Sequence, residues 1–168
     1  TACEGFASRL VDALRGRRGQ SRVPTLPAGG AWLFVEIAGD DSHEAVERAR
    51  ALAAQGIGRT TAVVTHEAEQ ATLWRIREDG AGLAGRSPAG RPAWPGWEDA
   101  AVPPEQLGAY LADFESLLAS HELTAAPFGH FGEGCMHVRL DFPLERAGGL
   151  EVMRGFLHEA AGLVARYG

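Results

Sequence analysis

The chain has 168 residues, 45% of them hydrophobic, which is enough to bury the core of one ordinary domain. Its formal net charge is -6, and its 16 basic residues, all Arg, form no basic stripe, which argues against a nucleic-acid partner. No signal peptide or membrane span of ~20 apolar residues is visible, and two cysteines are too few for a disulfide framework, so we expect a cytoplasmic protein.

Apolar side chains recur at intervals of three and four residues in five segments, which is the spacing of an amphipathic helix. The predicted helices are residues 4–16, 42–53, 67–78, 104–120 and 149–167. Short runs of apolar and β-branched residues predict strands instead. These are residues 31–38, 60–65, 98–102, 123–131 and 135–144. The Gly- and Pro-rich residues 16–30 and 79–96 are predicted to be loops.

The order of these elements indicates the fold class. Short strands joined by helices, with a hairpin before the last helix, predict a single α+β domain over residues 1–168. We expect a ferredoxin-like antiparallel sheet with helices packed on one face.

The candidate site lies in a hairpin near the C-terminus. A two-residue turn at Glu133 and Gly134 would place His130 opposite His137, with Cβ atoms roughly 4.5–5.5 Å apart. Two imidazoles so placed can hold one metal ion or one anionic ligand. Beyond the turn, strand alternation puts one polar set on one face and one apolar set on the other. The polar set is His137, Arg139 and Asp141, and the apolar set is Val138, Leu140 and Phe142.

The histidine pair also has a simpler interpretation, as polar strand residues satisfied by hydrogen bonds. A catalytic zinc usually takes three protein ligands, so two histidines alone are an incomplete site. Glu133 and Asp141 are the candidate third ligands nearby, although Glu133 is expected to face solvent at the turn.

The other polar candidates have similar alternatives. Arg77 can bind an anion or can simply interact with the carboxyl end of its helix dipole. Arg139 can form a bidentate pair with a substrate carboxylate or a salt bridge with Asp141 or Glu36. Cys135 has no obvious activating base, so a small packing residue is the expected interpretation.

Three segments in this order resemble one family: residues 73–78 (LWRIRE), 97–103 (WEDAAVP) and 129–137 (GHFGEGCMH). They resemble the C-terminal domain of the FAD-linked oxidases of the vanillyl-alcohol-oxidase superfamily. The nearest types are the glycolate oxidase flavin subunit and the D-lactate and D-2-hydroxyglutarate dehydrogenases. The resemblance covers nearly the whole chain.

The resemblance implies that this chain is the cap, or substrate-binding, domain of a larger flavoenzyme whose FAD-binding domain is a separate part of the parent chain. It implies dehydrogenation of a 2-hydroxy acid such as D-lactate or glycolate, with hydride passing to FAD. Versions fused to an iron–sulfur domain imply such a domain or subunit as a partner, and the parent enzyme can be peripheral to the membrane. The isolated chain is expected to be inactive. The alternative is a stand-alone ferredoxin-like module that binds a metal or an anion without catalysis.

The resemblance also implies site roles. His130 and His137 would bind a divalent metal such as zinc, and Arg77 would contact the substrate carboxylate, while a third ligand and a base are expected after the last helix. Arg139 stands where some relatives have a substrate-binding Asn, and Cys135 where Asn is usual. The remaining departures are Glu133 in place of Asp and Trp97 in place of a Lys found in some relatives.

Overall fold

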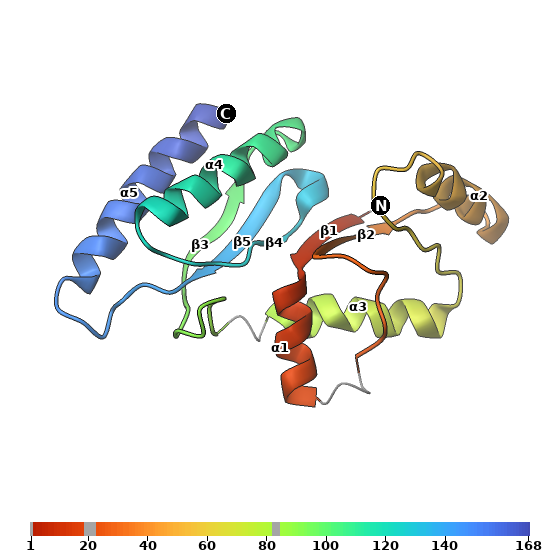
Figure 1. The fold of residues 1–168 in the computed structure, drawn as a ribbon. Coiled ribbons are helices and arrows are strands. Elements are labelled where there is room, and N and C mark those ends of the chain that lie inside the picture. Colours follow the sequence, from red (N-terminus) through yellow and green to blue (C-terminus); the bar gives the residue numbers. More distant parts are fainter. Residues whose placement is uncertain (1, 19–22, 82–84) are drawn as a thin grey trace.

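The computed structural model describes residues 2–18, 23–81 and 85–168 (Figure 1). Within this part of the chain, five strands form one sheet in the order β2-β1-β4-β5-β3, and every pairing is antiparallel. The predicted α+β class with an antiparallel sheet is therefore confirmed. The strands are β1 (Ala2–Ala7), β2 (Ala31–Glu36), β3 (Trp94–Ala101), β4 (Phe128–Gly129) and β5 (Cys135–Leu140).

The helices follow the predicted amphipathic segments closely after the first. They are α1 (Ser8–Arg18), α2 (Ser42–Ala53), α3 (Glu67–Ala81), α4 (Leu107–Ser120) and α5 (Gly149–Tyr167), with 3-10 turns η2 (Pro104–Gln106) and η3 (Phe131–Glu133). Asp41 caps α2 through its carboxylate. The predicted loops include residues 19–22 and 82–84, which lie outside the described residues.

One core lies between β3, β5, α4 and α5. Met136, Val138 and Leu140 point from β5 into this core and are fully buried. Phe114 of α4 and Phe156 of α5 meet edge to face there, with ring centroids 5.8 Å apart. The apolar face predicted for this strand is thus confirmed, and α4 and α5 lie side by side over it (Figure 1).

A second core lies at the other half of the sheet. Phe6 of β1 packs with Leu10, Leu14 and Ile76, which come from α1 and α3. Phe6 is paired with Phe128, and Phe128 with His137, so this core adjoins the face of β5 that carries His137. Helices α4 and α5 cover the face of β5 opposite to His137. Helices α1 and α3 form a second layer, which packs over β1.

Two segments of the N-terminal half differ from the prediction. Residues 4–7, predicted to begin a helix, belong to β1, which supplies the partner for β2 in six consecutive residue pairs. Residues 60–65, predicted to be a strand, form no strand and are mostly exposed. As a result β2 is an edge strand rather than a buried one, and Leu33 and Val35 are 54% and 41% exposed.

Gly134 is required by both its backbone and its surroundings. Its φ is +70°, in the left-handed region. A Cβ built there would overlap the carbonyl oxygen of Val102. The N–H of Val102 donates to the Gly134 carbonyl at 3.1 Å, so the two segments are held together. Gly134→Ala is expected to lower the free energy of unfolding by at least about 2 kcal/mol, measured by urea denaturation.

Gly148 provides the matched control for this prediction, because its φ is +84° and nothing lies within 4 Å of its built Cβ. Gly148→Ala should cost only the left-handed backbone term of about 1 kcal/mol. Equal losses in the two variants would contradict the steric argument for Gly134.

Candidate functional site

The hairpin that carries the two histidines is longer than predicted. Phe128, rather than His130, is paired with His137 across β4 and β5. The two strands are connected by η3, which ends at Gly134 in the left-handed conformation. The N–H groups of Glu133 and Cys135 donate to the His130 carbonyl at 3.0 and 3.1 Å. The predicted two-residue turn and the direct His130–His137 pairing are therefore wrong.

The two imidazoles nevertheless meet. Phe128 and His130 are two residues apart and share a face, so His130 is a diagonal neighbour of His137. The ring centroids lie 5.3 Å apart with the planes at 82°. The structure thus brings together the pair that sequence reasoning singled out, by a different register.

His130 is held by a buried glutamate. Nδ1 of His130 lies 2.7 Å from Glu4 Oε1, and Arg77 Nε donates to Glu4 Oε2 at 3.0 Å. Glu4 is only 5% exposed. Burial is the largest influence on the pKa of Glu4 and acts to raise it, but the hydrogen bonds and charges of His130 and Arg77 together outweigh it and lower the pKa. The carboxylate is therefore ionised at neutral pH.

His137 is held from β3 by a β-bulge. Trp97 pairs with Val138 and Ala100 with Met136, so both Glu98 and Asp99 lie opposite His137. Asp99 has a φ of +53°, a left-handed conformation that Asp tolerates better than most residues. Nδ1 of His137 is 3.3 Å from Glu98 Oε2 and 3.8 Å from Asp99 Oδ1.

The two histidines thus have matching surroundings. Each has a glutamate at Nδ1, Glu4 for His130 and Glu98 for His137, and each glutamate has an arginine beside it. Arg139 Nε lies 3.4 Å from Glu98 Oε1, in ion-pair rather than hydrogen-bond geometry. At His130 the carboxylate at Nδ1 fixes the ring and directs Nε2 toward a ligand. At His137, Nδ1 also accepts a hydrogen bond from the backbone N–H of Asp99 at 3.4 Å.

Arg77 does not follow its simpler interpretation, whereas Arg139 forms a salt bridge as its simpler interpretation predicts, but with a different carboxylate. Arg77 lies before the last turn of α3 and contacts Glu4, with an NH2 nitrogen 3.4–3.5 Å from the His130 ring nitrogens. Arg139 pairs with Glu98, and the salt bridges predicted with Asp141 or Glu36 do not form.

Three predicted neighbours lie outside the cluster. Asp141 is buried and accepts hydrogen bonds from the Thr124 backbone and hydroxyl, both at 2.7 Å, so it is not available as a metal ligand. Glu133 is exposed at the end of η3. Trp97 points to the other face, where its indole donates to the Tyr110 hydroxyl at 3.0 Å and stacks near Phe114.

Sequence reasoning missed Glu4 and Glu98 as part of the site. The helix predicted over residues 4–16 hides the strand alternation that puts Glu4 on the face of Phe6. Glu98 was placed in a strand, but a two-residue period cannot show that a bulge sets two residues against one. The acidic pair Glu98-Asp99 within a short strand was the available signal.

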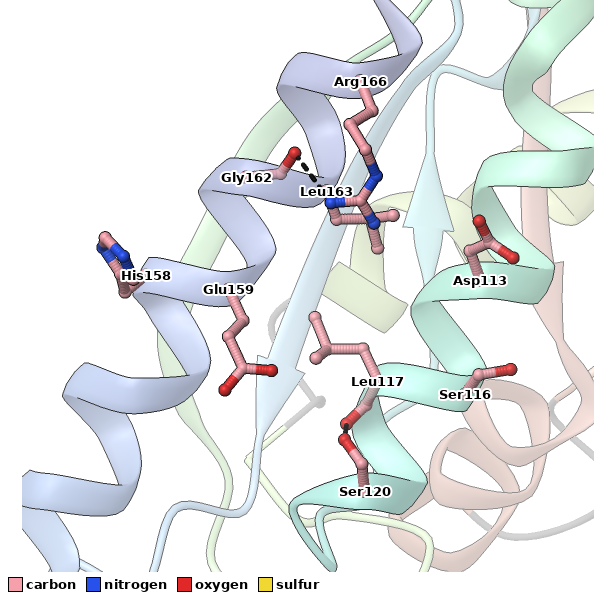
Figure 2. A pocket seen from close by; sticks show the side chains of 9 residues that line it. All are labelled: Asp113, Ser116, Leu117, Ser120, His158, Glu159, Gly162, Leu163 and Arg166. Carbon is pink, nitrogen blue, oxygen red and sulfur yellow. Dashed lines mark hydrogen bonds between the residues drawn. The ribbon is translucent and has the colours of Figure 1, made fainter.

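A surface groove lies elsewhere on the molecule. It has a volume of about 480 Å³ and lies between α4 and α5, where Asp113, Glu159 and Arg166 line it (Figure 2). None of its lining residues belongs to the histidine cluster, and its polar groups are exposed, so it is not the candidate site. Among the described helices, none combines the length and the apolar character needed to cross a bilayer.

Comparison with known proteins identifies the family of this chain. Residues 1–168 match the model of the family described as FAD linked oxidases, C-terminal domain. The chain belongs to this family.

The two relatives described here are both D-2-hydroxyglutarate dehydrogenases. The chain is 34% identical over 147 residues to the D-2-hydroxyglutarate dehydrogenase of Escherichia coli (strain K12), covering 80% of this chain and 14% of that protein. It is 32% identical over 144 residues to the D-2-hydroxyglutarate dehydrogenase of Pseudomonas putida, again covering 80% of this chain and 14% of that protein. The chain thus spans only a small part of the length of these curated relatives.

Proposed function

We propose that the chain is the substrate-binding domain of an FAD-dependent dehydrogenase that oxidises a 2-hydroxy acid to a 2-oxo acid. The observation that carries this proposal is the pair of neighbouring histidines, each with a glutamate at Nδ1 and an arginine beside that glutamate. Such a cluster offers two imidazole ligands and two arginines on one face of a sheet. Membership of the FAD-linked oxidase family supports FAD as the electron acceptor.

The donor set fits a divalent metal such as zinc. Two imidazoles on one tetrahedral zinc, with Zn–N bonds of about 2.0–2.1 Å, place their ring centroids about 5 Å apart. The observed separation of 5.3 Å is compatible with His130 and His137 sharing one ion. A third protein ligand is expected from outside the cluster, because the Asp141 carboxylate already accepts a hydrogen bond from Thr124.

The residues of the cluster have separable roles in this proposal. FAD supplies the acceptor for the C2 hydrogen, and a bound divalent ion supplies a Lewis acid for the 2-hydroxyl. Glu4 and Glu98 hold the two imidazole rings in orientation. Arg77 would bind the substrate carboxylate with the guanidinium nitrogens that Glu4 does not use, and Arg139 provides a second cation on the same face.

The proposal is tested in the longer flavoenzyme that carries this chain. The purified holoenzyme is mixed anaerobically with D-2-hydroxyglutarate, D-lactate or glycolate, and reduction of the bound flavin is followed by absorbance. We expect at least one of the three to bleach the flavin, with the corresponding 2-oxo acid as product. A flavin that none of the 2-hydroxy acids reduces would contradict the proposal.

Arg77 should matter for the substrate carboxylate. Arg77→Gln is expected to lower kcat/KM about 10–100-fold, because a hydrogen bond to a charged group contributes roughly 1.5–3 kcal/mol. Arg75, two residues away on α3 and exposed, provides the matched control. Equal kcat/KM values for Arg75→Gln and Arg77→Gln in steady-state kinetics would contradict a role for Arg77 in binding the substrate.

A further inference from the structure

The thiol of Cys135 belongs to a second group of potential metal ligands that does not include His130. A ring nitrogen of His137, Sγ of Cys135 and a carboxylate oxygen of Asp99 all lie within 4.8 Å of one another. Sγ of Cys135 and Nδ1 of His137 are each 3.8 Å from Asp99 Oδ1. Strand alternation puts Cys135 and His137 on the same face of β5, and the bulge in β3 brings Asp99 to both.

We propose that Asp99, Cys135 and His137 form a binding site for a thiophilic divalent cation such as Zn²⁺. This site shares His137 with the His130–His137 pair but does not include His130, and it does not depend on flavin chemistry.

The separations agree with a single tetrahedral ion. Bonds of about 2.3 Å to sulfur and 2.0–2.2 Å to nitrogen and oxygen place the ligand atoms about 3.4–3.6 Å from one another. The two observed separations of 3.8 Å exceed this range by only a few tenths of an ångström. Oε2 of Glu98, 3.3 Å from the same Nδ1, places a second carboxylate next to the site.

The local charge also favours a cation. The carboxylates of Asp99 and Glu98 lie beside the thiol of Cys135 and Nδ1 of His137. The same carboxylates attract a divalent ion. When the ion binds, the S–H bond breaks, the sulfur–metal bond forms and the proton leaves to solvent.

His137 belongs to both potential sites and links them. A neutral imidazole has one free lone pair, so His137 can serve one ion at a time. A cation held at Nδ1 by Asp99 and Cys135 therefore competes with one held jointly with His130.

Co²⁺ is the probe for this site, because a thiolate ligand gives a sulfur-to-cobalt charge-transfer band in the near ultraviolet. The 168-residue chain is titrated with Co²⁺, and we expect the band to saturate at one equivalent. Cys135→Ser should abolish it, whereas Cys3→Ser, which removes the other free cysteine, should leave it unchanged. His137→Ala should weaken Co²⁺ binding, while His130→Ala should retain the band.

The His130 variant separates this site from the metal site of the proposed function. Circular dichroism confirms that each variant is folded, and His130→Gln replaces His130→Ala if the alanine variant is not. The proposal is overturned if the wild-type chain gives no thiolate band, if Cys3→Ser removes the band, or if the folded His130 variant loses it. Loss of the band on replacing His130 would mean that the ion sits between the two histidines.

Discussion

Replacing His130 with alanine is expected to weaken zinc binding by the proposed parent flavoenzyme at least about 100-fold. Replacing an outer-shell residue around a metal typically costs about 10–100-fold in affinity, and a direct ligand should cost more. His130 is the suitable residue because it belongs only to the two-histidine site, with its Nδ1 at 2.7 Å from Glu4 and its ring 5.3 Å from His137.

Zinc affinity is measured by competition with a coloured chelator, in a Cys135→Ser background so that the thiol does not contribute. His158→Ala, an exposed histidine on α5, is the control. Glu4→Gln should fall between the two, with a loss of about 10–100-fold, because it frees the His130 ring without removing the ligand. Unchanged zinc affinity in His130→Ala would contradict the assignment of His130 as a metal ligand.

Replacing Asp141 with alanine is expected to lower the free energy of unfolding by about 2–3 kcal/mol. The carboxylate is buried and accepts hydrogen bonds from Thr124 N, Thr124 Oγ1 and Arg91 Nε at 2.7, 2.7 and 2.8 Å. Its loss leaves a partly buried N–H and hydroxyl without an acceptor, and hydrogen bonds to charged groups contribute roughly 1.5–3 kcal/mol each. Urea denaturation at pH 7 measures the change.

Asp141 also predicts a pH dependence of stability. Burial is the largest influence on the pKa of Asp141 and acts to raise it, but hydrogen bonds from Thr124, Ser87 and Arg91 outweigh it and lower the pKa. The stabilisation is therefore complete above the unfolded pKa of about 3.9 and is lost as the pH falls through the lower folded pKa. Asp141→Asn should show a flatter decline of stability below about pH 4 than the wild type. A parallel decline in both would contradict the assignment.

The helices of the C-terminal half were predictable from the sequence. The apolar stripe of α5 is long enough that its period is unambiguous, and the predicted residues 149–167 are the observed ones. The apolar face of β5 was equally clear, because Met136, Val138 and Leu140 alternate and all three are buried. In both elements local periodicity and tertiary burial agree.

The N-terminal strands were not predictable in the same way. Phe6, Leu10 and Leu14 are spaced like a helical stripe, yet Phe6 belongs to β1 and the other two to α1, so the spacing crosses a junction. Residues 60–65 are rich in β-branched residues, but no described strand pairs with them. Strand formation depends on a partner and a buried face more than on intrinsic preference.

The sequence predicts only part of the site, because the other part depends on contacts between distant segments. The histidine pair comes from one hairpin, which is a local feature of the sequence. Glu4 reaches His130 across 126 positions of sequence, and only the strand order β1-β4-β5 brings them together. The contact of Glu98 with His137 depends on a bulge, which no two-residue period reveals.

The most direct test of the central proposal is the rate at which a 2-hydroxy acid reduces the flavin of the holoenzyme when His130 is replaced. Wild type, His130→Ala and Cys135→Ser are compared anaerobically by stopped-flow absorbance at equal flavin content, with the best substrate of the three tested. The proposed role of His130 predicts a rate at least about 100-fold lower in His130→Ala, from the loss of a metal ligand. Flavin reduction at the wild-type rate in His130→Ala would contradict it.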